Sequence, residues 1–317
     1  MIRDVHESYI VISSAMTSDS ILSPEQIRSN IILQRSARHA DALFETAFAW
    51  RFPDITGYWG ISDQNDANAS ICKIGGEVHI VVTRGAFERF ALARRRLSDN
   101  QRLSEDLIVA AFGDVHHARN LTSSYLGEAL ELFSIAAILG HELGHAVDRF
   151  DVQARVKNLH DLELAEEISA DGHAALAGLA IIEAWAADMA GRTEICLQGL
   201  RRLGAILLVL ANSLLDDILL EQDWVVSEDQ THPTGSQRLL GFCVHVNDHF
   251  REAEERGFGV LAMAIALTAL GDLDLGPRFD FGDIKSLVDN YDGEIIERQY
   301  ETLQGALAQR LARPLKE

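Results

Sequence analysis

The chain has 317 residues, of which 47% are apolar and only five are proline, a composition that predicts a globular, helix-rich protein with a sizeable core. Its formal net charge of −20 argues against a nucleic-acid backbone or an anionic membrane as partner, and favours a neutral or cationic substrate. The three cysteines, Cys72, Cys196 and Cys243, are scattered without paired spacing, which is typical of a reducing compartment and argues against structural disulfides.

The apolar stretches of the chain suggest neither a targeting segment nor a membrane span. The N-terminus has an apolar run of only four residues, too short for the core of a secretory signal peptide. The longest apolar stretch, LGAILLVLANSLL at 203–215, is too short for a bilayer and is interrupted by Asn212 and Ser213. We therefore expect a buried helix there and a soluble, cytoplasmic protein without a membrane span.

The first strong helix signal begins at Ser23. Ser23 has the position of an N-cap, Pro24 lies in the first turn and Gln26 at the third helical position, where it completes a capping box. The helical pattern continues to about Trp50, and turn-forming residues between 52 and 66 end it.

A turn and a strand are predicted next. Gly75 and Gly76 indicate the turn, and the alternation of Val78, Ile80 and Val82 indicates a strand with one buried face. Further helices are predicted over 87–97, 124–150, 162–190, 193–220, 236–255 and 283–312. The pattern predicts a predominantly helical α+β fold with a small sheet, in a single domain over 1–317.

Residues 141–145 read HELGH inside one of these helical patterns. Positions i and i+4 lie on one face of a helix, so His141 and His145 would offer two imidazoles to one metal ion, with Glu142 beside the bound water. The alternative is a buried amphipathic helix with two hydrogen-bonded histidines. A catalytic zinc site needs three protein ligands, which leave the fourth position for water.

The third ligand is sought in the next helix, which contains LELAEEISADGHAA. Glu167 and Asp171 are four residues apart on one face, and the loop at 151–160 is long enough for an antiparallel return. We expect Glu167 to bind the metal and Asp171 to accept a hydrogen bond from the free ring nitrogen of a ligand histidine. Glu163, on the same stripe, and Glu166, about a quarter-turn away, compete with Glu167 for the ligand role.

HELGHA followed by E-x-x-A-D resembles the gluzincin metallopeptidases of the HtpX and CAAX prenyl protease type. Two further segments resemble that family and occur in its order: NASICKIGGEVHIVVTRG at 68–85 and THPTGSQRLL at 231–240. The matches lie between about Asn68 and Leu240, so the first and last quarters of the chain are not covered. The resemblance implies a zincin-like metalloprotease domain whose small sheet lies beside the HExxH helix.

The resemblance implies a zinc endopeptidase that holds one zinc per chain on His141, His145 and Glu167. Zinc acidifies its bound water and polarises the scissile carbonyl, and Glu142 takes the proton of the water and passes it to the leaving amine. The oxyanion needs a further donor.

In the resembling family, the histidine of the T-H-P segment stands near the oxyanion, which here is His232. Arg238 of the same segment is expected to pair with Asp171. The strand at 77–82, with Asn68, Val78 and Ile80 as its substrate edge, would hydrogen-bond an extended protein or peptide substrate.

The chain also departs from the family pattern. The members named above carry membrane spans, whereas none is expected here; soluble relatives of this kind include the Lit-type phage-exclusion peptidases. The spacing between Asn68 and His141 is long, so 94–122 looks like an inserted lid or specificity element. We expect a catalytic core at about 64–245 and a helical C-terminal part at 246–317.

Two alternative functions follow from the same residues. Peptide deformylases also use HExxH, but with a cysteine ligand whose upstream motif is absent here, and Cys72 is in the wrong context. A catalytically degenerate zincin that serves as a binding or regulatory module is the non-enzymatic alternative. Such proteins usually lose the base or a ligand, whereas Glu142 and the expected ligands are present, which favours an active peptidase.

Overall fold

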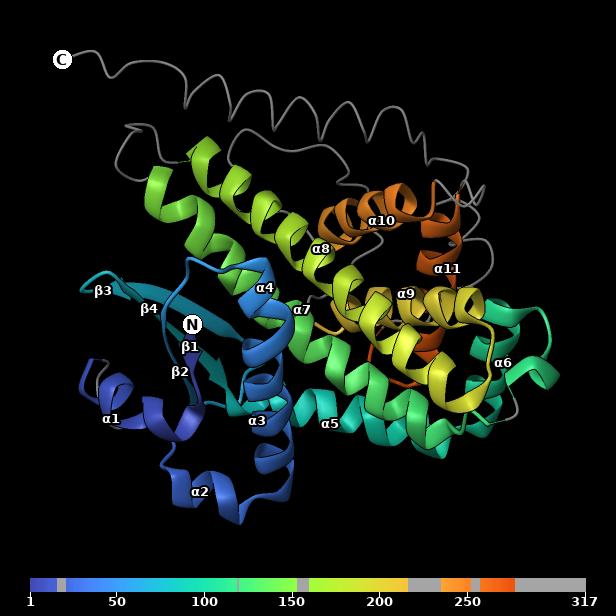
Figure 1. Ribbon diagram of the computed structural model, residues 1–317, viewed down its shortest axis with the longest axis horizontal. Coiled ribbons are helices and arrows are strands. Elements are labelled where there is room, and N and C mark those ends of the chain that lie inside the picture. Colours follow the sequence, from blue (N-terminus) through green and yellow to red (C-terminus); the bar gives the residue numbers. More distant parts are fainter. Residues whose placement is uncertain (16–20, 119, 153–159, 216–234, 252–256, 277–317) are drawn as a thin grey trace.

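The computed structural model describes residues 1–15, 21–118, 120–152, 160–215, 235–251 and 257–276. Over these ranges the protein is mostly helical, with a four-stranded mixed sheet on one side of the helices (Figure 1). The predicted predominantly helical α+β class is therefore confirmed. The predicted helix at 283–312 lies outside the described residues.

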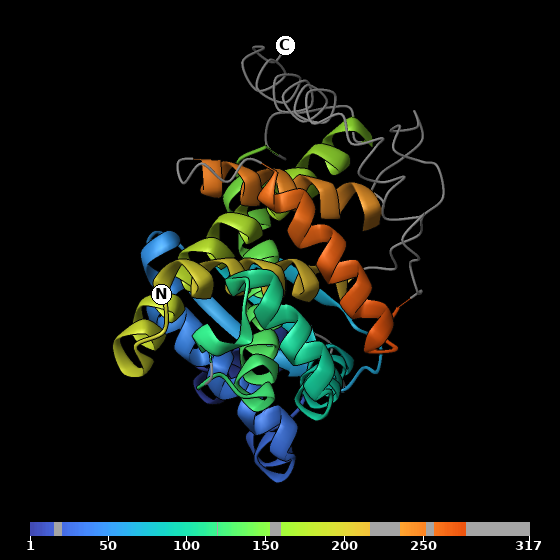
Figure 2. The same ribbon diagram turned by 90° about the vertical axis from the view of Figure 1, so that its right-hand side faces the viewer.

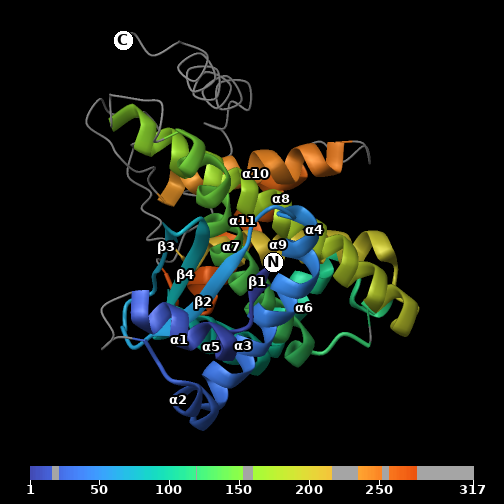
Figure 3. The same ribbon diagram turned by 60° about the vertical axis from the view of Figure 1, so that its left-hand side comes forward.

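The strands follow the order β1, β2, β4, β3 across the sheet (Figure 3). Their bounds are Ile2–Arg3 for β1, Gly57–Ser62 for β2, Ala69–Ile74 for β3 and Glu77–Thr83 for β4. β2 runs parallel to both β1 and β4, whereas β3 is antiparallel to β4. β3 therefore forms one edge of the sheet in the part of the chain that is described.

The predicted Gly75-Gly76 turn is confirmed as a two-residue hairpin between β3 and β4, because Ile74 pairs with Glu77. Both glycines have positive φ, 61° and 94°, as a type I′ turn requires. The prediction that this strand has one buried face is wrong: β4 is buried on both faces. Helix α1, Val5–Ala15, packs on the sheet and covers the second face around Tyr58 and Val81.

The helix predicted from Ser23 to Trp50 begins with the predicted capping box, but it is interrupted at Asn30. Asn30 has an extended backbone (φ −109°, ψ 111°), and its side chain accepts hydrogen bonds from the backbone of Ile32 and Leu33. A short amide side chain competes in this way with the helix ladder and starts a new helix. The pieces are α2 Pro24–Ser29, α3 Ile31–Leu43, a π-helix at Phe44–Phe48 and α4 Ala49–Arg51.

The remaining helices form the larger part of the core. They are α5 Arg84–Asp99, α6 Gln101–Phe112, α7 Ser123–Val152, α8 His160–Thr193, α9 Leu197–Ser213, α10 Gly235–Arg251 and α11 Phe258–Asp272. The long helices α7 and α8 pack side by side, and α9, α10 and α11 lie on their side away from the sheet (Figures 1 and 2). The apolar run of α9 is fully buried, as predicted.

The segment 94–122, for which the sequence suggests an inserted lid, contains the end of α5 and all of α6. Leu97, Leu103 and Leu107 from this segment are buried in the main core. It is therefore attached through core packing, and a role as a lid or specificity element stays a prediction.

Two helical segments, Ser123–Val147 and Glu166–Thr193, are long and apolar enough to cross a membrane by length and composition alone. In this fold, 83% of the first window and 50% of the second are buried inside the protein. A buried core helix passes the same test, so the two segments are weak evidence for a membrane protein.

A buried carboxylate holds α7 against the N-terminal helices. Glu131 is fully buried, and it accepts hydrogen bonds from Arg35 Nε at 2.9 Å and Nη2 at 3.0 Å. Ser36 Oγ donates to the same carboxylate at 3.1 Å, and Arg94 Nε lies 3.5 Å away. Glu131 thereby joins α3 and α5 to α7.

A partly buried carboxylate, that of Asp41 on α3, holds the N-terminal segment in place. Its Oδ1 accepts hydrogen bonds from Trp59 Nε1 at 2.8 Å and from the backbone nitrogen of Val5 at 3.1 Å. Burial raises the pKa of Asp41 to about 6, although these two hydrogen bonds act in the opposite direction. The charged form of Asp41 is therefore disfavoured in the folded protein.

We expect Asp41→Asn to remove a pH dependence of stability between about pH 4 and pH 6. The folded protein binds the Asp41 proton more tightly than the unfolded chain, so its stability is highest at low pH within this window. It falls as pH rises through the folded pKa of about 6. An amide oxygen accepts the same two hydrogen bonds without a charge, so the variant should be the more stable protein at pH 7. Urea unfolding at several pH values measures this, and an unchanged pH profile would contradict it.

Candidate metal centre

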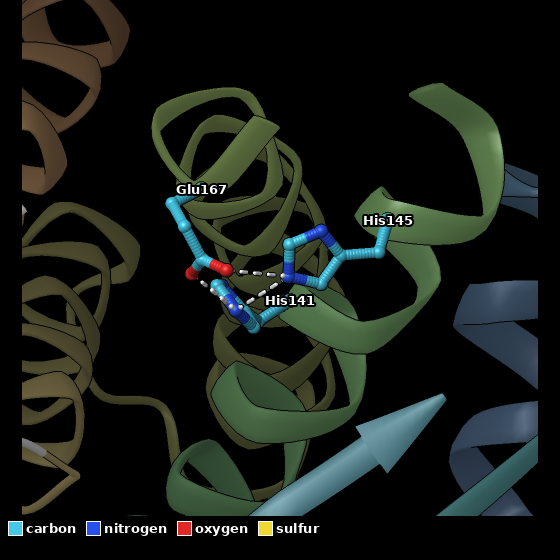
Figure 4. Close-up of side chains that lie close together, drawn as sticks. All are labelled: His141, His145 and Glu167. Atoms are coloured by element: carbon cyan, nitrogen blue, oxygen red, sulfur yellow. Dashed lines mark hydrogen bonds and ion pairs between the residues drawn. The ribbon is translucent and has the colours of Figure 1, made fainter. Parts of the chain in front are cut away.

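The two histidines of HELGH and a glutamate of the next helix meet between α7 and α8. Figure 4 shows His141 and His145 projecting from α7 toward Glu167 on α8. The Nε2 atoms of the two rings are 3.1 Å apart. Glu167 Oε2 is 3.3 Å from His141 Nε2, and Glu167 Oε1 is 3.4 Å from His145 Nε2. These three side chains form a group that could hold a metal ion.

The separations fit a tetrahedral ion. Zinc in proteins binds nitrogen and oxygen at roughly 2.0–2.2 Å in tetrahedral geometry, so two of its ligand atoms are about 3.3–3.5 Å apart. The observed separations of 3.1, 3.3 and 3.4 Å are close to this spacing, with the two distances to Glu167 ending on different carboxylate oxygens. One ligand atom from each side chain lies within 4.8 Å of the others, which is compact enough for one ion to contact all three side chains.

Asp171 and Arg238 lie directly behind His141. His141 Nδ1 is 2.8 Å from Asp171 Oδ1, so a proton on Nδ1 donates to the carboxylate and leaves Nε2 for the ion. Arg238, on α10, donates through Nε to Oδ2 at 2.9 Å and through Nη2 to Oδ1 at 2.7 Å. Three helices are thus joined through one carboxylate.

The charges of the group set its protonation states. Burial lowers the pKa of His141, but hydrogen bonds to Asp171 and Glu167 outweigh it and raise the pKa to about 10. Burial raises the pKa of Asp171, whereas the charge of Arg238 and the hydrogen bond from His141 lower it to about 2. The pKa of Glu167 is lowered because contacts with His141 outweigh its burial. Both carboxylates are therefore ionised at neutral pH, whereas His141 carries a proton on both ring nitrogens in the absence of a metal. A metal ion would bind Nε2 in exchange for its proton.

The structure places the other expected site residues as follows. Glu142 is 6% exposed and Glu166 is 5% exposed; among the described side chains, Glu167 and not Glu166 joins the two histidines. The side chain of Glu163 and the whole of His232 lie outside the described residues. The role of His232 therefore stays a prediction.

The strand at 77–82 was expected to be an edge, and this expectation is wrong for the described sheet. β4 lies between β2 and β3 and is paired along both sides, so Val78 and Ile80 cannot offer their backbone to a peptide. β3, which begins directly after Asn68, is the edge, and it packs beside α7. The Gly75-Gly76 turn was the signal for this second strand, since a two-residue turn joins two strands in a hairpin.

In comparisons with known proteins, no family model, no curated protein and no solved structure matches the chain. The resemblance to the gluzincin metallopeptidases rests on the sequence segments alone. What the structure adds is a buried His-His-Glu group on two helices, consistent with a site of the HExxH type.

Proposed function

We propose that this protein is a zinc-dependent endopeptidase that hydrolyses peptide bonds in protein substrates. The observation that carries the proposal is the convergence of His141, His145 and Glu167, whose donor atoms lie at separations close to those around a tetrahedral ion. Three protein ligands are typical of a catalytic zinc, because the fourth position is kept for water or substrate.

The residues around the site would divide the chemistry between them. A bound zinc ion would supply Lewis acidity and lower the pKa of a water molecule. Glu142, which is buried next to His141 in α7, would accept the proton of the attacking water and deliver it to the leaving amine. Asp171 would fix the His141 ring through Nδ1, and Arg238 would fix Asp171. His232 remains our candidate for the oxyanion donor.

An extended peptide would bind along β3. This strand is partly exposed, and the side of its backbone that does not pair with β4 is a sheet edge. Such an edge accepts an added strand through main-chain hydrogen bonds. Because β3 packs beside α7, a peptide there would run close to the helix that carries the histidines. We propose a cytoplasmic location and a protein or peptide substrate.

The metal is tested first. We expect the purified protein to hold about one zinc per chain. Glu167→Ala should lose most of the zinc, because only two of the three protein ligands, the imidazoles, would remain. His141→Ala and His145→Ala should lose zinc in the same way. Elemental analysis after dialysis measures the content. Glu166→Ala is the matched control, since Glu166 is also a glutamate of α8 with little exposure, and it should keep the zinc. A wild-type zinc content in Glu167→Ala would mean that another residue is the third ligand.

A further inference from the structure

Two glycines of α7 lie at the contact with α8, each directly before a histidine of the metal centre. A Cβ atom added at Gly140 would lie 3.1 Å from Ala174 Cα. One added at Gly144 would lie 2.7 Å from Ala170 Cα and 3.0 Å from the Ala170 carbonyl oxygen. These are contacts with the main chain of α8, so no side-chain rotation can relieve them.

The two contacts follow an antiparallel register, with Gly140 against Ala174 and Gly144 against Ala170. The helices are therefore in near backbone contact over a full turn, at the level of the ligands. Glycine disfavours a helix, and its use at a helix contact is explained by the close approach of another backbone. The close spacing between α7 and α8 at this point is possible because Gly140 and Gly144 have no side chains.

The spacing between the helices affects the metal ligands unequally. His141 and His145 belong to one helix, so the distance between their main-chain positions does not depend on α8. Glu167 belongs to the other helix, and its distances of 3.3 and 3.4 Å to the two rings do depend on it. A shift of α8 would therefore displace Glu167 directly, and it would also move Asp171, which holds the His141 ring through Nδ1.

We infer that Gly140 and Gly144 are positioning residues of the metal centre: they hold α8 close enough for Glu167 to share one ion with both histidines. This inference rests on the proposed metal site. Metal–ligand bonds tolerate deviations of only about 0.2 Å. A methyl group at Gly144 would require the main chain of α7 or α8 to shift, and one at Gly140 would require a shift of a few tenths of an ångström. The glycines thus control the ligand set without touching the metal.

The test uses Co²⁺ as the probe, because its visible absorption reports the number and geometry of its ligands. We expect Gly144→Ala to raise the Kd for Co²⁺ by about ten- to a hundredfold and to change the absorption spectrum. In the double variant Gly144→Ala, Glu167→Ala, the loss should be clearly smaller than the sum of the two single losses, because both changes remove the Glu167 ligand. A purely structural glycine would give additive losses, and additive losses would overturn the inference.

Gly178→Ala is the matched control. Gly178 is also a helix-contact glycine of α8, but its added Cβ would meet the Leu208 side chain of α9, at 2.7 Å. We expect this variant to unfold at a lower temperature while keeping wild-type affinity for Co²⁺. An equal loss of affinity in Gly178→Ala would overturn the inference.

If Gly144→Ala does not fold, Gly140→Ala allows the same double-variant comparison with a milder contact. Wild-type affinity for Co²⁺ in the folded glycine variants would overturn this inference alone. Failure of the wild-type protein to bind Co²⁺ would overturn the proposed function as well, so the two failures can be told apart.

Discussion

Glu142→Gln is expected to keep its zinc and its fold but to lose about a hundred- to ten-thousandfold in peptide hydrolysis, the range for removal of a general base. Glutamine has almost the same volume as glutamate, so the buried position beside His141 stays filled. The amide cannot accept a proton from water at neutral pH. Because Glu142 does not belong to the His-His-Glu group, zinc content should not change.

Turnover of an unstructured protein, followed by the appearance of new N-termini, measures this loss. Glu166→Gln is the control, since it makes the same change at a similarly buried glutamate of α8 and should stay near wild-type activity. Activity of Glu142→Gln within about tenfold of wild type would exclude the proposed proton transfer. A wild-type protein that binds zinc but cleaves nothing would favour a degenerate zincin with a binding or regulatory role.

Glu131→Ala is expected to lower the free energy of unfolding by about 3–5 kcal/mol, the range for breaking a buried ion pair by removal of one partner. Glu131 is fully buried, and its removal leaves Arg35 and Arg94 near the core without their shared carboxylate. Arg94 keeps Glu128 as a partner, so the loss comes from the unpaired charge of Arg35 and from the lost hydrogen bonds of the buried carboxylate. Chemical denaturation followed by circular dichroism measures it.

Glu128→Ala gives the matched comparison on the same helix. Glu128 also pairs with Arg94, at 3.3 Å, but its side chain is 50% exposed. Exposed pairs of this kind contribute about 0–1 kcal/mol, so this variant should be close to wild type in stability. Similar losses in Glu128→Ala and Glu131→Ala would mean that burial of the carboxylate is not what makes the cluster important.

The long helices and the metal group were the features most accessible from sequence. His141 and His145 are four residues apart in a helix, so local helix geometry alone predicts that their side chains lie on the same face. The sequence alone leaves three candidates for the third ligand, Glu163, Glu166 and Glu167. Tertiary contacts set the rotation of α8 about its axis and thereby decide which glutamate faces α7. Those contacts include Ala170 against Gly144.

The sheet was less accessible because its pairing is not local. The paired residues of β1 and β2 are 55 positions apart in the chain, and nothing in either segment specifies the other. The second buried face of β4 depends on α1, which lies far away in sequence. Asn30 was read as an ordinary helical position, although its side chain caps a new helix there. Helix α11 is apolar throughout and gives no amphipathic stripe from which its buried face could be read.

The order in which the metal centre can assemble during folding follows from where its parts lie along the chain. His141 and Asp171 are 30 positions apart on two consecutive helices, whereas His141 and Arg238 are 97 apart. Closing the longer loop costs about 1 kcal/mol more entropy than closing the shorter one. Contacts close in sequence also tend to form earlier than distant ones. The donor atoms can therefore come together once α7 meets α8, before α10 brings in its arginine. Metal binding at the proposed site would thus not require a completely folded chain.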